Sequence, residues 1–322
     1  MIIYTPPRAA THIPVIDLVG SFYDEARFKR VAGQIHRACR ETGFFYVTGH
    51  GVPESLMDAE IAAARSLFAL PEAEKAAVAI DRSPCRRGYE AGAQMLDPGS
   101  PPDLKESFML GRELGPDHPY VRDGVPMHGA NLWPALPGFR EQAEAYEAAM
   151  IRLGSHLLRC LAVSLELAPD WFDAGLREAQ AGVRLLHYPP QPADAAFNQI
   201  GAGAHTDWGS ITILLQDDMA GLEVRNADGD WILARPIPGT FVINIGQMME
   251  RFTAGLYRAN LHRVRNADPT RARHSVACFF ELDHFHVMGR APTCPPNPAF
   301  EPDVELSVGQ HIEQMARASY GG

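Results

Sequence analysis

Hydrophobic residues in the first half of the chain recur mainly at helical spacing. In the clearest case, apolar residues step by three and four from Phe139 to Leu161, which predicts a long helix that lies against a sheet. Shorter stripes predict one helix that ends near Thr42 and a second over residues 56–68. Two short apolar runs predict strands, at residues 13–18 and 43–47.

The pattern changes to period two and short apolar runs after Gly182. Gly, Asp and Pro separate these runs, and Asp228–Gly229 is a typical hairpin turn. Regular short strands of this kind favour an antiparallel sandwich, barrel or jelly roll, so the fold class is mainly β with flanking helices. The predicted strands are Val183–Tyr188, Ser210–Gln216, Leu222–Arg225, Trp231–Pro236, Thr240–Gly246, Asn260–Arg265 and His274–Leu282.

Periodicity fades between residues 82 and 134, where short ordered islands stand in a loop-rich stretch. Long loops in a compact domain are often binding loops or lids. We expect four segments along the chain. They are an N-terminal helical and loop-rich region (1–135), scaffold helices (136–181), a β core (182–290) and a C-terminal extension that packs on this core (291–322).

Composition narrows the class of protein. The 322 residues carry a formal net charge of −10 without a basic stripe, which argues against a nucleic-acid partner. No apolar run approaches membrane-spanning length, and the N-terminus lacks the pattern of a secretory leader. The five cysteines are odd in number and widely spaced, as in a reduced protein, so we expect a cytoplasmic location. The oligomeric state is not indicated.

Candidate metal ligands lie in the stretch Gly203–Ser210. If this stretch is extended, His205 and Asp207 point to the same side, because side chains alternate along a strand. A third ligand is needed, and His262 on a later predicted strand is the best candidate. Two histidines and one carboxylate leave positions open on a metal, an arrangement associated with non-haem Fe(II) oxygenases.

A carboxylate receptor is predicted eleven residues after His262. Arg273 and Ser275 share one face of a strand, and a guanidinium with a neighbouring hydroxyl suits the two oxygens of a carboxylate. Tyr188 is a further phenolic donor for the same receptor. The sequence therefore predicts a metal centre beside a site for an organic acid.

These motifs, in this order, resemble the isopenicillin N synthase-like family of Fe(II)- and 2-oxoglutarate-dependent dioxygenases over nearly the whole chain. The resemblance is far more specific than any single motif, since several short matches follow one another. The matching segments are Ile13–Leu18, Gly43–Val47, His50–Pro53, Arg87–Tyr89, Lys105–Phe108, His205–Asp207, Val242–Gly246, His262–Val264 and Arg273–Ser275.

The resemblance implies a double-stranded β-helix, or jelly roll, and a specific site. It implies that His205, Asp207 and His262 hold Fe(II). 2-Oxoglutarate would chelate the iron, with its far carboxylate on Arg273 and Ser275 and with help from Tyr188. O2 would be the oxidant, and a small organic molecule would be hydroxylated, desaturated or cyclised with release of succinate and CO2.

Substrate contacts are predicted at three further positions. By resemblance to substrate-contacting positions in the family, Arg87 would clamp a substrate carboxylate; the alternative is a solvated loop arginine. Phe279 shares strand parity with Arg273, so it faces the same interior, either as ordinary core or as a pocket wall. Gln247 stands where the family often has an acid, which alters a pocket wall or a supporting hydrogen bond. The family's plant members often have Asn before the tyrosine, whereas His187 precedes Tyr188 here.

Two other functions remain open on the sequence alone. One is an iron-dependent oxidase that does not use 2-oxoglutarate, since isopenicillin N synthase keeps the same arginine and serine. The other is a ligand-binding relative that has lost catalysis. We expect His50, His187 and His274 to be structural histidines, and the pair His284 and His286 to lie at a pocket edge or surface.

Overall fold

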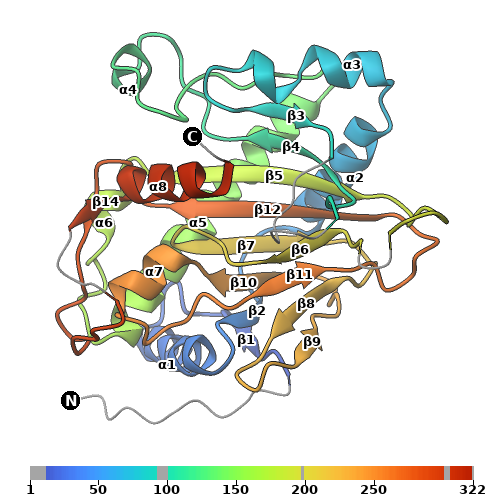
Figure 1. Ribbon diagram of the computed structural model, residues 1–322. Coiled ribbons are helices and arrows are strands. Elements are labelled where there is room, and N and C mark those ends of the chain that lie inside the picture. The colour runs from blue at the N-terminus through green and yellow to red at the C-terminus, as the bar shows by residue number, and fades with distance from the viewer. Residues whose placement is uncertain (1–11, 93–100, 197–198, 301–304, 321–322) are drawn as a thin grey trace.

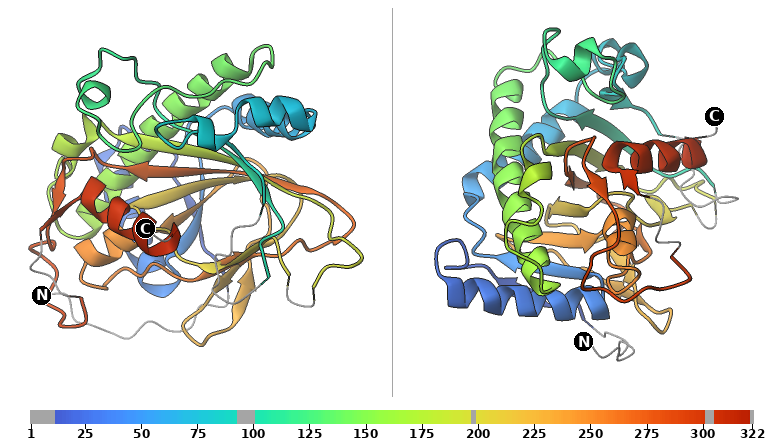
Figure 2. Two further views of the ribbon diagram at one scale, coloured as in Figure 1. Left: turned by 45° about the horizontal axis from the view of Figure 1, so that its top comes forward. Right: turned by 90° about the vertical axis from the view of Figure 1, so that its left-hand side faces the viewer.

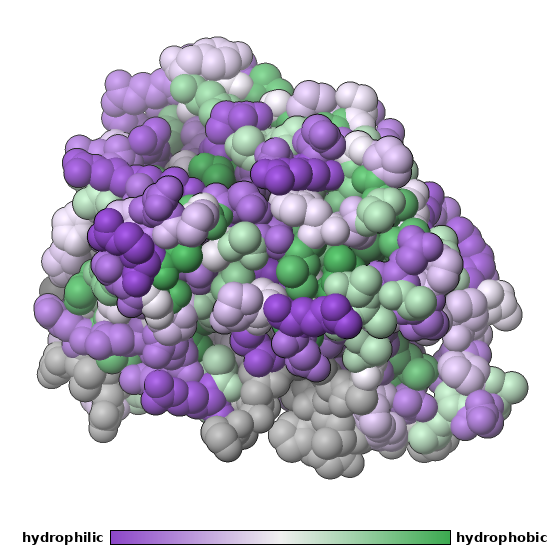
Figure 3. Space-filling view, turned by 90° about the horizontal axis from the view of Figure 1, so that it is seen from above, coloured by the Kyte–Doolittle hydropathy of each residue, from purple (hydrophilic) through white to green (hydrophobic). Residues whose placement is uncertain are grey.

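The computed structural model describes residues 12–92, 101–196, 199–300 and 305–320. Residues 1–11, on which the expectation about a leader rests, lie outside these ranges. In the described part, no helix is long and apolar enough to cross a membrane. Seen from the side of β3 and α3, hydrophobic side chains show between hydrophilic ones on the surface (Figure 3).

A large mixed sheet runs through the centre of the molecule (Figure 1). It is antiparallel except at one edge, where β1 pairs with β2 in parallel. Both halves of the chain contribute strands, so the N-terminal region is part of the sheet. In spatial order the strands are β1 (Val15–Asp17), β2 (Phe44–Thr48), β10 (Phe241–Ile245), β7 (Ile211–Gln216), β12 (Arg273–Glu281), β5 (Gln180–Tyr188), β4 (Glu106–Leu110) and β3 (Gly88–Glu90).

A smaller sheet faces the large one. Leu222 and Val224 of this sheet pack against Phe44 and Val242 of the large sheet in one apolar cluster. Two facing sheets joined in this way confirm the expected double-stranded β-helix. The order of strands in the smaller sheet is β6 (Ala202–His205), β11 (His262–Val264), β8 (Leu222–Arg225) and β9 (Trp231–Leu233); β13 (Val287–Met288) and β14 (Leu306–Ser307) form a separate pair.

Helices cover the other face of the large sheet. The long helix predicted from the apolar stripe is α5 (Phe139–Ser164), which packs on α1 (Glu25–Glu41), α2 (Glu54–Phe68) and the central strands. Figure 2 shows α1 and α5 on one side of the sheet and α8 (Val308–Tyr320) on the opposite side. The remaining short helices are α3 (Glu72–Ala77), η1 (Ile80–Arg82), α4 (Pro119–Arg122), α6 (Asp173–Leu176) and α7 (Gln247–Phe252).

The two faces of strand β12 have different roles. Val276, Cys278 and Phe280 belong to the large apolar core that is shared with the helices. The alternate positions from Arg273 to Glu281 line a cavity between the two sheets. Successive side chains of a strand point to opposite faces, so one strand builds both the core and the wall of the cavity.

Two details differ from the sequence-based expectation. Strand β6 ends at His205, so Asp207 lies in the loop before β7 rather than on the same strand. The loop-rich stretch 82–134 contains β3 and β4, which extend the large sheet beyond β5. β3 has only three residues, too few to show alternation in a sequence.

Candidate metal and cosubstrate site

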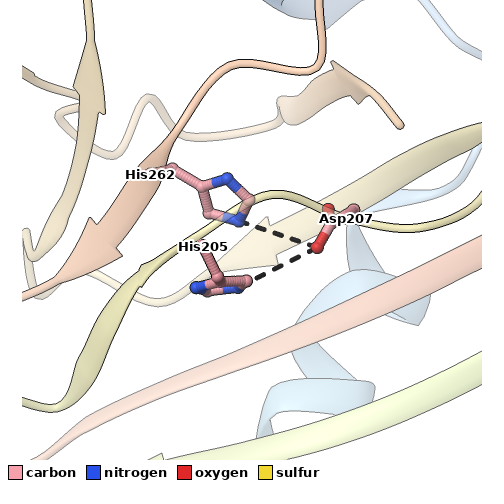
Figure 4. Close-up of side chains that lie close together, drawn as sticks. All are labelled: His205, Asp207 and His262. Atoms are coloured by element: carbon pink, nitrogen blue, oxygen red, sulfur yellow. Dashed lines mark ion pairs between the residues drawn. The ribbon is translucent and has the colours of Figure 1, made fainter. Parts of the chain in front are cut away.

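Three side chains meet where the smaller sheet faces the large one. His205 Nε2 lies 3.9 Å and His262 Nε2 lies 3.7 Å from Asp207 Oδ1 (Figure 4). The ligand atoms of the three residues all lie within 4.8 Å of one another. In the described part of the chain, this is the one such cluster of metal-ligating side chains.

Pairing between strands aligns the two histidines. His262 on β11 is directly opposite His205 on β6, and the ring centres are 4.3 Å apart. His205 Nδ1 lies 2.8 Å from the carbonyl oxygen of Gly203, and His262 Nδ1 lies 3.3 Å from that of Asn260. A carbonyl accepts only, so each Nδ1 carries the proton and each Nε2 presents a lone pair to the cluster.

Asp207 is oriented by two donors, although it lies beyond the strand. Thr212 Oγ1 and Asn244 Nδ2 donate to Asp207 Oδ2 at 2.5 and 2.7 Å. The other oxygen, Oδ1, therefore faces the two histidines. The sequence-based argument from strand alternation named a residue that does lie beside the two histidines, but hydrogen bonds from β7 and β10 set its direction.

The electrostatics favour deprotonated ligands. Burial and the neighbouring His262 lower the pKa of His205, so its imidazole is neutral at pH 7. Burial opposes ionisation of Asp207, but the two histidines and the two donors together hold its pKa below the usual value. Two imidazoles and one carboxylate with supporting hydrogen bonds fit a divalent iron ion.

Arg273 is a buried cation without an anionic partner. Its side chain is 1% exposed, Nη1 donates to Ser275 Oγ at 3.2 Å, and Nη2 donates to Gln216 Oε1 at 3.0 Å. Its Nε has no hydrogen-bond partner, and no carboxylate of the described residues lies within ion-pair distance. Because an unpaired buried charge is costly, this guanidinium is ready to receive an anion from a ligand.

Tyr188 packs against the same guanidinium. It lies opposite Arg273 in the pairing of β5 with β12, and the guanidinium carbon is 5.0 Å from its ring centre. Burial is the main reason that the pKa of Tyr188 is raised, so the phenol keeps its proton and is a neutral donor. Arg273, Ser275 and Tyr188, which the sequence predicted as one receptor, therefore lie together.

One cavity of about 760 Å³ is lined by the histidine–aspartate cluster, by the arginine receptor and by further residues, and we call the part away from the cluster and the receptor the chamber. Arg87 and Phe279 line this cavity, whereas Gln247 is not among its lining residues. Gln247 Nε2 instead donates to Thr206 Oγ1 at 2.8 Å, in the loop between β6 and β7 that carries Asp207. Its predicted contact with a substrate stays a prediction, and the structure shows it as a support of that loop.

Arg87 is held in the chamber by neutral groups. Nη1 donates to Asn131 Oδ1 at 3.0 Å, and Nη2 donates to the carbonyl oxygen of Met127 at 2.9 Å. Its side chain is buried over Gly111, where a β-carbon would lie 2.0 Å from Nη1. No ion pair joins Arg87 to a carboxylate of the described residues, so this second buried guanidinium is also available to an anion.

The other histidines singled out in the sequence lie outside the ligand cluster. His187 and His274 stack at 4.7 Å on the face of the sheet that α2 covers. The His50 ring lies between the backbone of Gly239 and that of Val52. His284 lines the cavity, as expected for a residue at a pocket edge.

Sequence reasoning missed the residues that orient the ligands. Thr212, Asn244 and Gln216 are polar residues inside buried strands, and each contacts a predicted site residue. An unpaired polar group in a buried strand is costly, so such residues are a usable signal of a neighbouring site. That signal gives no partner until the register between strands is known.

Comparisons with known proteins agree with this geometry. A family model described as the non-haem dioxygenase in morphine synthesis N-terminal domain matches residues 13–136, and the model of the 2OG-Fe(II) oxygenase superfamily matches residues 179–282. The 2-oxoglutarate-Fe(II) type oxidoreductase hxnY of Emericella nidulans is 38% identical over 97% of this chain and 92% of its own length. The chain belongs to the 2OG-Fe(II) oxygenase superfamily.

Further members of the superfamily extend the likeness. Homoarginine-6-hydroxylase 2-ODD-233 of Oryza sativa is 38% identical over 84% of this chain and 85% of its own length. The crystal structure of a full-length Neurospora crassa protein in complex with alpha-KG and thymine matches with a TM-score of 0.83, at 27% identity, over 96% of this chain and 97% of that chain. The protein is therefore a 2-oxoglutarate- and Fe(II)-dependent dioxygenase, with O2 as its oxidant.

Proposed function

We propose that His205 Nε2, Asp207 Oδ1 and His262 Nε2 hold the Fe(II) of this oxygenase. Arg273 and Ser275 receive the far carboxylate of 2-oxoglutarate, and Tyr188 completes that receptor. The substrate is a small organic molecule that occupies the chamber beyond the metal ligands, against Phe279, with Arg87 as the partner of an acidic group.

One observation carries this proposal: the guanidinium of Arg273, which has no carboxylate partner among the described residues, lines the same cavity as the three candidate metal ligands. A metal site alone would not explain a fully buried arginine that lacks an anion. An acid that bridges the receptor and the metal explains both features at once. 2-Oxoglutarate carries a carboxylate at each end, as such a bridge requires.

The residues of the chain bind, orient and shield the reactants. When bound, the iron and 2-oxoglutarate supply the oxidising chemistry that converts a C–H bond of the substrate, with succinate and CO2 as co-products. Thr212 and Asn244 fix the direction of Asp207, and Gln216 fixes the direction of Arg273. The apolar part of the lining excludes water from the reacting centre.

The relatives support a small-molecule substrate without naming it. One hydroxylates homoarginine, and another binds thymine in its crystal structure. We infer hydroxylation, desaturation or ring closure as the class of outcome, because each begins with oxidation of a C–H bond. A nucleic-acid or membrane partner is not part of the proposal, and a cytoplasmic location is supported by five unpaired cysteines.

The proposal is tested without knowledge of the substrate. Purified protein is loaded with Fe(II) and 2-oxoglutarate in the absence of O2, and the weak visible charge-transfer absorption of the chelate is recorded. The parent protein shows this band. Asp207→Ala abolishes it because an iron ligand is lost, and Arg273→Ala weakens it because the cosubstrate loses its charged partner.

Two matched controls come from one exposed ion pair. Asp218 and Arg271 pair at 3.0 Å on the surface, so Asp218→Ala and Arg271→Ala remove the same side-chain types away from the cavity and keep the band. Iron binding without a band in the parent would favour the oxidase that does not use 2-oxoglutarate. Full turnover in Asp207→Ala would overturn the assignment of the metal ligands.

A further inference from the structure

Glu281 is a buried acid on the wall of the substrate chamber. It is the last residue of β12, it has the same strand parity as Arg273 and Phe279, and it lines the cavity. Its side chain is only 8% exposed. Neither the metal site nor the cosubstrate receptor uses it.

Ser210 holds one oxygen of this carboxyl group. The backbone N–H and the hydroxyl of Ser210 both donate to Glu281 Oε2, at 2.8 and 3.0 Å. Oε2 therefore supplies lone pairs to two donors. Glu281 Oε1 has no hydrogen-bond partner among the described residues. It is also not one of the polar atoms that are both fully buried and without a partner. It is the oxygen left to face the chamber.

The surroundings favour the neutral acid. No lysine, arginine or histidine of the described residues lies within ion-pair distance of Glu281. Burial, together with the negative charge of Asp207, raises the pKa of Glu281 to about 8 in spite of the Ser210 hydrogen bonds. Because Oε2 already accepts two hydrogen bonds, the proton resides on Oε1.

The position of the carboxyl group is fixed near the metal ligands. Ser210 follows Asp207 by three residues, and Oε1 lies over Gly209, where a β-carbon would be only 1.3 Å away. Only glycine leaves room for the carboxyl group at this point. The loop that contains Gly209 is held in place by hydrogen bonds, since the N–H of Met248 donates to the carbonyl oxygens of Trp208 and Gly209.

We propose that Glu281 orients the substrate by donating a hydrogen bond from Oε1 to an uncharged acceptor, a carbonyl oxygen or a ring nitrogen. The substrate class is then a small organic molecule that is neutral at this point and carries such an acceptor next to the C–H bond that reacts. This inference rests on the proposed function, since the same cavity must hold the metal and the cosubstrate.

A charged partner fits these contacts less well. A substrate ammonium would require the ionised carboxylate, which burial and Asp207 both oppose. A substrate carboxylate finds its partner at Arg87 instead. The Arg87 guanidinium lies over Gly111, directly after β4, and β4 is two strands from β12, or roughly 10 Å. The chamber therefore offers a guanidinium for an acid at one position and a neutral donor at another.

The test compares two head groups on one ring. Binding of benzamide and of benzylamine is measured by calorimetry at pH 7, under anaerobic conditions, on protein loaded with Fe(II) and 2-oxoglutarate. The chelate band, recorded first, reports on the proposed function independently. Benzamide, which carries a carbonyl acceptor, should bind about tenfold more tightly than the cationic benzylamine. Equal binding, tighter binding of benzylamine, or no binding of benzamide would overturn the proposal.

Two variants separate the hydrogen bond from packing. In Glu281→Gln the amide oxygen can accept from Ser210 while the amide nitrogen donates from the position of Oε1, so benzamide binding stays within about threefold. Glu281→Leu removes the donor and weakens benzamide binding about tenfold. Glu313→Gln, a change to a partly exposed acid on α8 that also lines the cavity, is the matched control.

A spectroscopic readout covers the case in which Glu281→Leu fails to fold. The infrared difference spectrum of the parent minus Glu281→Gln at pH 7 should contain the carbonyl stretch of a protonated carboxyl group. Other buried acids cancel in this difference because both proteins contain them. A spectrum with only carboxylate bands, or loss of benzamide binding in Glu281→Gln, would refute the assignment of Oε1 as a donor.

Discussion

Asn244 donates a hydrogen bond of 2.7 Å to the oxygen of Asp207 that faces away from the two histidines. The donor lies on β10 and the acceptor lies in the loop before β7, 37 residues earlier in the chain. This contact, with that of Thr212, makes the remaining oxygen of Asp207 the one that meets His205 and His262. The direction of this candidate metal ligand is therefore set by a neighbouring strand.

Asn244→Ala should weaken iron binding without unfolding the protein. The loss of one orienting donor to a metal-ligating carboxylate typically costs ten- to a hundredfold in metal affinity. Titration of the apoprotein with Fe(II) under anaerobic conditions measures the change. Asn297→Ala, on a loop that contacts Ala254, serves as the control. An affinity equal to that of the parent would show that Thr212 alone suffices.

Arg273→Lys should be nearly as harmful to cosubstrate binding as Arg273→Ala. A lysine keeps the charge but loses the planar fork that bonds Ser275, Gln216 and a carboxylate together. We expect the apparent affinity for 2-oxoglutarate to fall about ten- to a hundredfold in the alanine variant. Titration followed by the chelate band gives both values, and unchanged affinity in the alanine variant would place the cosubstrate elsewhere.

Gln247→Ala distinguishes support of the ligand loop from contact with the substrate. Its side chain bonds Thr206, and its backbone N–H bonds the carbonyl oxygen of Asp207. Loss of the side-chain bond should lower iron affinity several-fold, on the estimate of about 1 kcal/mol for a neutral hydrogen bond, and leave the KM for substrate nearly unchanged. A large rise in KM with normal iron binding would instead confirm the predicted substrate contact.

Glu60→Gln should make the protein more stable at neutral pH. Glu60 is 1% exposed in the helical layer, and burial raises its pKa to about 7 from an ordinary value of 4.5. The unfolded chain therefore releases this proton first as pH rises, and the parent loses stability between about pH 4.5 and pH 7. At ~1.4 kcal/mol for each unit of pKa, the loss is about 3 kcal/mol.

Urea unfolding of the parent and of Glu60→Gln at pH 4.5 and pH 7.5 tests this sign. The free energy of unfolding of the variant should exceed that of the parent only at the higher pH, because at pH 4.5 the folded parent keeps Glu60 protonated. The control is Glu41→Gln, a change on the exposed surface of α1. It should leave the pH dependence of the free energy of unfolding the same as in the parent. A gain that is equal at both pH values would mean that the effect is packing rather than proton linkage.

The sequence predicted most of the fold because the two periodicities are strong. The apolar stripe of α5 is buried as expected, and β8 has the predicted bounds. The short strands of the stretch 82–134 were not predicted, since their pairing with β5 is a long-range contact that a local pattern does not contain. The ends of strands also differ by one or more residues, as at β11, which was predicted over Asn260–Arg265 and spans His262–Val264.

The candidate site was predictable to the extent that its residue types are distinctive. A histidine, an aspartate, a second histidine and then an arginine rarely follow one another in this way for purely structural reasons. Gln216, Asn244 and Glu281 were missed because a polar residue in a buried strand has no assigned partner until the strands are in register. Sequence reasoning therefore named the groups that meet at the candidate site, but not the groups that hold them in place.

The alternation along β12 has a consequence for how this enzyme can diversify. Positions 277, 279 and 281 face the chamber, while 276, 278 and 280 face the core. Substitutions at the odd positions can reshape the space offered to a substrate while the packing between sheet and helices stays intact. Insertion or deletion of one residue would exchange the two sets, so divergence of substrate range at this strand should proceed by replacement and never by a change in length.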